Sequence, residues 1–249
     1  MLKYIPNFIT SANLICGCIA CVLATLNQFD AAFLMVLVGI FFDLFDGLLA
    51  RLLNVTSKLG LQLDSLADLI TSGFVPGIVV YQLFLRSGVI VSHFKLNLFN
   101  QDVIFSIAPI ALIAFLIPLG AAFRLAKFNI RESKSSDFFG LPTPANSIFF
   151  CSLPLFIDNS SFLFISNYLK SAYVLIFITV FFVFLMNSNW RLFSFKNNLN
   201  LKFDTLIYPI LLLLLSTPLL YYYSAAAFPI IIVIYLLLSA TRNWILFQS

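Results

Sequence analysis

Apolar residues occur along this chain in long runs that are separated by short polar segments. At 1.5 Å per residue, most of these runs have the length that a helix needs to cross a bilayer. The pattern predicts eight helices, at about 7–27, 31–53, 60–84, 103–125, 144–157, 168–188, 205–222 and 226–243. The fifth run is short, and it either ends near 157 or continues with a kink through Phe162–Ile165. We therefore expect an all-α polytopic membrane protein.

Basic residues gather in alternate breaks between the runs. If the N-terminus is cytoplasmic, 11 of the 14 Lys and Arg residues fall on the cytoplasmic side, and only Arg86, Lys95 and Lys170 fall outside. An excess of Lys and Arg in cytoplasmic loops is the usual orientation signal of membrane proteins. The distribution predicts eight spans with both termini in the cytoplasm, in a bacterial-type inner or cell membrane.

Composition supports this class of protein. With 61% hydrophobic and 10% charged residues, the chain has too much apolar surface for a soluble domain to bury. The net charge of +4 follows from where the basic residues stand and does not indicate a nucleic-acid surface. We expect one transmembrane core of six helices over residues 1–200, followed in 201–249 by two further helices that carry almost no polar residues.

Four of the ten acidic residues stand inside two predicted helices, as Asp43-x-x-Asp46 and Asp64-x-x-x-Asp68. An unpaired carboxylate near the centre of a bilayer costs roughly 2.5–3.5 kcal/mol on insertion scales. Arg51 is the one arginine nearby, so ion pairing cannot neutralise four carboxylates. The array therefore predicts a metal site, and ligands that are all oxygens favour Mg²⁺ or Mn²⁺.

The spacing places all four carboxylates at similar depths. From the turn near residues 54–59, Asp46 and Asp43 lie about 10 and 15 Å into one helix, and Asp64 and Asp68 lie about 6 and 12 Å into the next. Residues spaced i, i+3 or i, i+4 share a helix face. Antiparallel packing can point both faces into one cavity that opens to the cytoplasm, where two metal ions roughly 3.5–4 Å apart would clamp a diphosphate.

Small residues and one arginine accompany the aspartates. Gly47, Ala50 and Gly60 leave room for a nucleotide or for a neighbouring backbone. Arg51 can offset the charge of a leaving phosphate and bind it through its fork of donors. These residues belong to the candidate site together with the aspartates.

The spaced residues together resemble a known signature, D-x-x-D-G-x-x-A-R-x8-G-x-x-x-D-x-x-x-D, which is that of the CDP-alcohol phosphotransferase family. All fixed positions match: Asp43, Asp46, Gly47, Ala50, Arg51, Gly60, Asp64 and Asp68. The resemblance implies transfer of a substituted phosphate from a CDP-activated alcohol or lipid to an acceptor hydroxyl, with release of CMP. It also implies that the first three aspartates bind metal, that Asp68 is the general base and lies near the second metal, and that the protein is a homodimer.

Further segments resemble one branch of that family, the CDP-diacylglycerol–serine O-phosphatidyltransferases. They are Ile5–Asn13, Arg124–Asn129, Phe139–Ala145, and the residues around Leu185–Met186 and Ser194–Lys196. The branch usually has Arg where Lys127 stands, which keeps the cation but weakens bidentate recognition. This resemblance implies CDP-diacylglycerol and L-serine as substrates and phosphatidylserine as the product.

Polar residues near the aspartates are candidate substrate contacts. Asn7, Thr10 and Asn13 recur every third residue and so share one stripe of a helix. Asn7 and Thr10 either line the cytidine side of the site or, for Thr10, cap the helix at the membrane interface.

Cations follow at the cytoplasmic end of the fourth predicted helix. Arg124 and Lys127 either bind the serine carboxylate or anchor the helix, and Asn129 can accept from the serine ammonium. We expect Arg131 and Lys134 to be anchors.

Several alternatives remain open. The same chemistry could use glycerol 3-phosphate, inositol, inositol phosphate or choline as the acceptor, and the displacement could be direct or pass through a covalent intermediate. A prenyltransferase also binds diphosphate through paired aspartates, but it does not require Gly47, Ala50 and Arg51 after them. A cation transporter could use an intramembrane aspartate cluster, although transporters often show repeated halves, and no second cluster occurs near the C-terminus.

Overall fold

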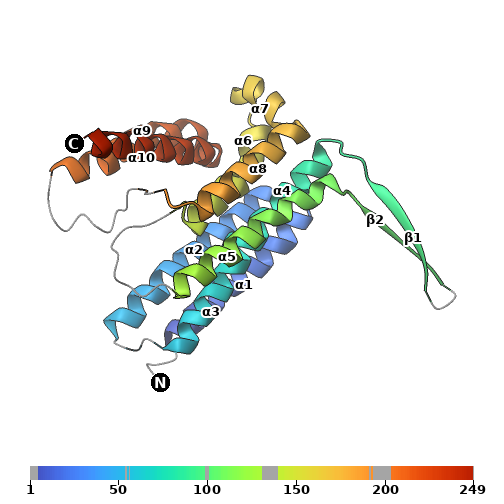
Figure 1. Ribbon diagram of the computed structural model, residues 1–249, viewed down its shortest axis with the longest axis horizontal. Coiled ribbons are helices and arrows are strands. Elements are labelled where there is room, and N and C mark those ends of the chain that lie inside the picture. Colours follow the sequence, from blue (N-terminus) through green and yellow to red (C-terminus); the bar gives the residue numbers. More distant parts are fainter. Residues whose placement is uncertain are drawn as a thin grey trace.

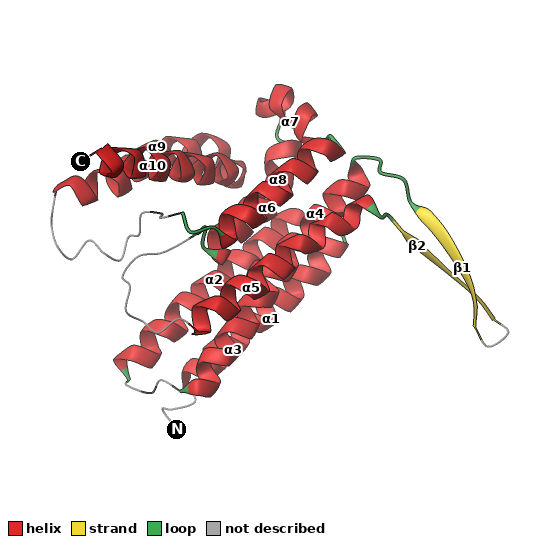
Figure 2. Cartoon of the chain, viewed as in Figure 1, coloured by secondary structure: helices red, strands yellow, loops and turns green. Residues whose placement is uncertain are grey.

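A computed structural model describes residues 5–53, 55, 57–98, 101–130, 140–190, 192 and 203–248. The regular structure in these ranges is helical apart from one β-hairpin (Figures 1 and 2). The helices are α1 (Ile5–Thr25), α2 (Phe29–Leu52), α3 (Lys58–Asp68), α4 (Val75–Arg86), α5 (Leu116–Ile130), α6 (Thr143–Asp158), α7 (Leu163–Leu169), α8 (Ala172–Asn187), α9 (Phe203–Tyr223) and α10 (Phe228–Gln248). The predicted all-α class is confirmed for the body of the molecule.

Helices α1 and α2 form an antiparallel pair (Figure 1). Ala20, Ala24 and Ala32 of this pair have no exposed surface. Within a bilayer, helices associate by close packing, and small side chains let two backbones approach. Asn27, with φ at +59°, makes the tight turn between the helices. The pair carries Asp43 near the far end of α2 and returns the chain toward the start of α1.

Helices α3 and α4 are the two halves of one 29-residue helix, Lys58–Arg86. A π-helical turn at Leu69–Phe74 separates them. Helix α4 packs against α1, α5 and α6, and Val75, Val80 and Phe84 have no exposed surface. This helix forms the centre of the bundle, and α3 extends it to the end where α2 finishes.

The β-hairpin corrects one prediction. We expected a loop over Arg86–Gln101 and a helix from residue 103, but β1 (Ser92–Leu98) pairs with β2 (Gln101–Ile107) in an antiparallel register. The helical structure begins only at Ile110–Phe115, as a 3₁₀ segment, and α5 then continues to Ile130. A short apolar run such as Val103–Ile107 fits a strand or a helix equally well by hydropathy alone.

The remaining helices lie against this core. Helix α6 ends at Asp158, and after a 3₁₀ turn α7 meets α8 at a bend of 81°. The predicted continuation of the fifth run through Phe162–Ile165 is thus a separate short helix. Helices α9 and α10 lie side by side in Figure 1 and pack on the core through contacts such as the Phe33–Phe228 ring pair, whose centroids are 5.2 Å apart.

In the described ranges, five helical stretches are long and apolar enough to cross a membrane, or six if the bent pair α7–α8 counts as one span. One of these stretches, Ile207–Asn243, contains both α9 and α10. The protein is therefore an integral membrane protein, and the arrangement of eight spans stays a prediction. Arg131, Lys134, Phe139 and Ser194–Lys196 lie outside the described residues.

Candidate metal centre

Three of the four aspartates meet where α2 and α3 pass each other. Carboxylate oxygens of Asp43, Asp64 and Asp68 all lie within 4.8 Å of one another. Asp43 comes from α2, and Asp64 and Asp68 lie one helical turn apart on α3. The antiparallel course of the two helices thus brings together residues that are about 20 positions apart in the sequence, as the depth argument predicted.

The charge of this cluster lacks compensation from basic side chains of the described residues. The ion pairs found there join Arg86 to Asp158 and Lys95 to Asp102, and neither involves the cluster. Asp64 Oδ1 is buried and has no hydrogen-bond partner in the part of the chain that the structure describes. Converging carboxylate oxygens, one of them buried and unpartnered, are the donors that a divalent cation prefers. The cluster is consistent with a metal site.

Asp46 lies outside this three-residue group. Its side chain is 4% exposed and accepts a hydrogen bond from the Thr10 hydroxyl. The same hydroxyl lies 3.0 Å from the carbonyl oxygen of Pro6, and Thr10 itself is 3% exposed. The structure therefore shows Thr10 buried against Asp46 and bonded to one oxygen of its carboxylate. The predicted contact of Thr10 with cytidine stays a prediction.

The small residues of the array have different surroundings. A Cβ atom added to Gly60 would lie 3.1 Å from both Asn7 Oδ1 and Ser57 Oγ, so Gly60 permits the close approach of α1 to α3. A Cβ added to Gly47 would meet only Arg51 Nη2, at 4.0 Å. Small residues were predicted to leave room for a neighbouring backbone or for a nucleotide. Gly60 leaves room for the neighbouring helix α1, and Gly47 faces open space.

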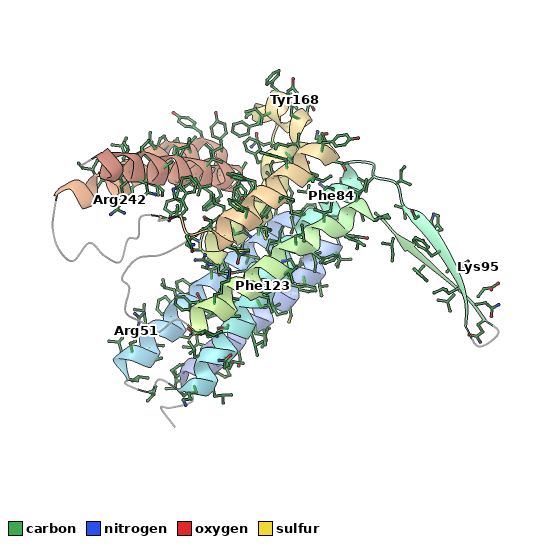
Figure 3. All side chains as sticks on the ribbon, in the orientation of Figure 1. Arg51, Phe84, Lys95, Phe123, Tyr168 and Arg242 are labelled. Atoms are coloured by element: carbon green, nitrogen blue, oxygen red, sulfur yellow. The ribbon has the colours of Figure 1, made fainter. Side chains whose placement is uncertain are left out.

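Arg51 lies on the last turn of α2 (Figure 3). Its Nε donates to the carbonyl oxygen of Gly47 at 2.9 Å, and the side chain is exposed. The preceding Ala50 is half-buried on the same turn. A guanidinium that is held through Nε keeps its two terminal nitrogens for other acceptors. The position suits an anion that approaches the open side of Gly47.

The predicted acceptor-binding residues of α5 separate into three environments. Asn129 Nδ2 donates to Ser65 Oγ of α3 at 2.9 Å, which places the amide one residue from Asp64. Lys127 is exposed. Arg124 Nη1 donates to the carbonyl oxygen of Met186 at 2.6 Å, at the end of α8. The structure thus bonds Asn129 to the helix that carries Asp64 and Asp68, and it bonds Arg124 to the end of α8.

Two further polar residues lie near the cluster: Ser65, for which the sequence predicted no role, and Asn13, which belongs to the predicted polar stripe. Ser65 directly follows Asp64 and bonds Asn129. Asn13 is fully buried, and its Nδ2 lies 3.3 Å from Asp68 Oδ1. The signal for Asn13 was present, because it continues the polar stripe of Asn7 and Thr10 into an apolar helix. For Ser65, the sequence contains no comparable signal.

A cavity of about 310 Å³ lies at the opposite end of the bundle. Its lining includes Asn27, Asp30, Arg86, Asp158 and Tyr223, and no residue of the aspartate array. We do not assign the reaction to this cavity, because the converging carboxylates of Asp43, Asp64 and Asp68 lie elsewhere.

Comparison with known proteins agrees with this geometry. Residues 3–185 match the family model described as CDP-alcohol phosphatidyltransferase. The chain is similar to the CDP-diacylglycerol–serine O-phosphatidyltransferase of Bacillus subtilis, with 34% identity over 143 residues, which cover 57% of this chain and 71% of that protein. It is also similar to proteins of the same name from Helicobacter pylori, with 32% identity over 57% of this chain and 54% of that protein, and from Methanocaldococcus jannaschii, with 33% identity over 60% of this chain and 61% of that protein.

Proposed function

This chain belongs to the CDP-alcohol phosphatidyltransferase family, and we propose that it transfers the phosphatidyl group of CDP-diacylglycerol to the hydroxyl of L-serine. The products are phosphatidylserine and CMP. The observation that carries the choice of serine is the Asn129 amide: its Nδ2 bonds Ser65, the neighbour of Asp64 in sequence, and its Oδ1 is buried and has no partner among the described residues. The names of the similar proteins support the same acceptor.

Asp43, Asp46, Asp64 and Asp68 would hold two divalent cations, Mg²⁺ or Mn²⁺. When bound, such ions neutralise the diphosphate and stabilise the charge that develops on the leaving phosphate. Around them, the Thr10 hydroxyl fixes one oxygen of Asp46. The exposed guanidinium of Arg51 supports the same leaving phosphate, and Gly47 leaves the space that the nucleotide needs.

Asp68 is the proposed general base. Its carboxylate takes the proton of the serine hydroxyl, and the serine oxygen forms a bond to the lipid-side phosphorus. The bond from that phosphorus to the oxygen bridging to the cytidine phosphate breaks, and CMP leaves with the electron pair. A group in this role has to be held in position, and Asn13 supplies one hydrogen bond to Asp68.

Acceptor recognition falls to α5. Asn129 Oδ1 accepts from the serine ammonium, and the cations Arg124 and Lys127 attract its carboxylate. Since Arg124 also bonds the carbonyl of Met186, its contribution to serine binding is electrostatic rather than a bidentate clamp. Asn7, beside Gly60, lines the cytidine side of the site together with Thr10.

We further propose the arrangement of the chain in the membrane. The active site faces the cytoplasm, as do both termini, in a layout of eight spans. Residues 1–200 form the six-helix catalytic core, and 201–249 add the two C-terminal helices. The protein acts as a homodimer.

An acceptor screen tests the proposed function. Purified protein in detergent receives CDP-diacylglycerol with Mg²⁺ or Mn²⁺, and serine, glycerol 3-phosphate, inositol, inositol phosphate and choline are offered separately while CMP release is followed. We expect release with serine only, and none from Asp64→Ala protein. Release with another acceptor would support phosphatidyl transfer but would contradict serine as the acceptor. If no acceptor supports release by folded protein, the phosphatidyl-transfer proposal fails.

A further inference from the structure

Asn13 of α1 lies fully buried between Asp68 and Thr71, which belongs to the π-helical turn after α3. Its Nδ2 donates to Asp68 Oδ1 at 3.3 Å. Its Oδ1 accepts from Thr71 Oγ1 at 2.8 Å, and the Asn13 carbonyl oxygen lies 3.2 Å from the same hydroxyl. Both nearby acceptors of the Thr71 hydroxyl therefore belong to Asn13, and the three residues form one chain of hydrogen bonds.

This chain of hydrogen bonds has a direction. A hydroxyl carries one proton, and the Thr71 proton points to Asn13 oxygens. An ionised carboxylate only accepts, so the amide presents Nδ2 to Asp68 and Oδ1 to Thr71. If the amide were turned over, Oδ1 would face the Asp68 carboxylate and two acceptors would oppose each other. By donating to Oδ1, Thr71 therefore stabilises the amide orientation that can hold Asp68.

The backbone around Thr71 is built to bring it to Asn13. The π-helical turn adds one residue to the helix, which rotates the residues that follow by about 100° around the axis. A Cβ added to Gly17 would lie 2.5 Å from Thr71 Oγ1, and one added to Gly39 would lie 2.8 Å from Thr71 Cγ2. Ser147 Oγ of α6 donates to the Thr71 carbonyl oxygen at 3.2 Å. Three other helices thus accommodate or hold this one threonine.

We propose that Asn13 is a positioning residue for Asp68 and that Thr71, placed by the π-helical turn, orients Asn13. The bond to Oδ1 restricts the rotation of the Asp68 carboxylate, which acts on the acceptor hydroxyl in the proposed reaction. The inference rests on the proposed function, because it assigns a purpose to holding Asp68 in one orientation. It adds that the π-helical turn between α3 and α4 contributes to the reaction by placing Thr71 against Asn13.

Two substitutions at one position test the inference. Thr71→Val keeps the shape of the side chain and removes the donor, whereas Thr71→Ser keeps the donor. We expect Thr71→Val to lower kcat about 10- to 100-fold, since small displacements of a reacting group have effects of this size, while KM for CDP-diacylglycerol stays within about twofold. Thr71→Ser should recover most of the lost kcat.

Thr179→Val is the matched control. Thr179 of α8 is also fully buried, and its hydroxyl has no partner in the described residues. The same substitution there should leave kcat unchanged. Wild-type kcat in Thr71→Val protein would overturn the inference, and so would equal losses of kcat and thermal stability in Thr71→Val and Thr71→Ser.

Mn²⁺ affinity, measured by electron paramagnetic resonance, separates this inference from the proposed function. If the unaltered protein releases no CMP with any acceptor, the proposed function fails. The Mn²⁺ affinities of the Thr71 variants then test whether Thr71 and Asn13 position Asp68. Weaker Mn²⁺ binding by Thr71→Val than by Thr71→Ser would support a role in orienting Asp68. Equal Mn²⁺ affinities in that case would overturn it.

Discussion

Asn129 of α5 donates a hydrogen bond to Ser65 of α3, the residue that follows Asp64 of the aspartate cluster. The Asn129 Nδ2 to Ser65 Oγ distance is 2.9 Å, and Ser65 is adjacent in sequence to Asp64. The other atom of the amide, Oδ1, is buried and unpartnered in the described part of the chain. A buried acceptor without a donor is unfavourable, and the ammonium group of serine would supply the donor.

This relationship predicts the effect of Asn129→Leu. Losing a hydrogen bond to a charged group costs about 1.5–3 kcal/mol, so KM for serine should rise about 10- to 100-fold. KM for CDP-diacylglycerol should change little, because the proposed nucleotide contacts lie on α1 and α2. Initial rates of CMP release at varied serine measure both constants. An unchanged KM for serine would remove Asn129 from the acceptor site.

Metal binding should stabilise the folded protein. A ligand at 100 times its Kd adds about 2.7 kcal/mol to the free energy of unfolding, so Mn²⁺ or Mg²⁺ should raise the thermal unfolding temperature. Asp64→Ala protein should lose this response, because Asp64 is one of the three converging carboxylates. Removal of metal with EDTA should also abolish CMP release. An equal thermal response in both proteins would place the ions elsewhere.

The hydrogen bond from Thr10 to Asp46 makes a separate prediction. Thr10→Val leaves a buried carboxylate without this donor, and we expect the free energy of unfolding to fall by about 1–3 kcal/mol. Thr10→Ser keeps the hydroxyl and should lose less than half of that amount. Thermal unfolding of both variants at one detergent concentration compares them. Equal stability of Thr10→Val and wild-type protein would show that the bond does not stabilise Asp46.

The two glycines of the array should respond differently to alanine. Gly60→Ala would place Cβ 3.1 Å from Asn7 Oδ1 and Ser57 Oγ, so these side chains must shift and stability should fall. Gly47→Ala meets nothing closer than 4.0 Å, and alanine favours a helix by about 1 kcal/mol. We therefore expect Gly47→Ala protein to be as stable as wild type but to have a raised KM for CDP-diacylglycerol. An unchanged KM would show that the nucleotide does not approach Gly47.

The sequence predicted the helices well where apolar runs were long, and it failed where they were short. The boundaries of α1 and α2 lie within two residues of their predicted positions. The hairpin was missed although Phe94, Leu96 and Leu98 alternate with polar residues, a period of two that is typical of a strand. Val103–Ile107 was absorbed into the next helix because hydropathy does not distinguish a strand from a helix.

For the site, spacing predicted that all four aspartates converge, and the structure brings three of them together and leaves Asp46 outside the group. Spacing did not predict what holds them. Helix periodicity was enough to bring Asp43 close to Asp64 and Asp68. The π-helical turn had no sequence signal, because Leu69–Phe74 continues an apolar helical run. Without that turn, the bonds from Thr71 to Asn13 and from Asn13 to Asp68 could not be foreseen. Contacts across three helices depend on packing geometry, which a single helix period does not contain.

Isotope transfer from serine tests the central claim most directly. Protein with CDP-diacylglycerol and Mn²⁺ receives L-serine labelled with ¹⁸O in its hydroxyl, and the lipid product and CMP are analysed by mass spectrometry. If the serine oxygen attacks the lipid-side phosphorus, the label appears in phosphatidylserine and CMP is unlabelled. CMP release without a labelled serine lipid would contradict the account.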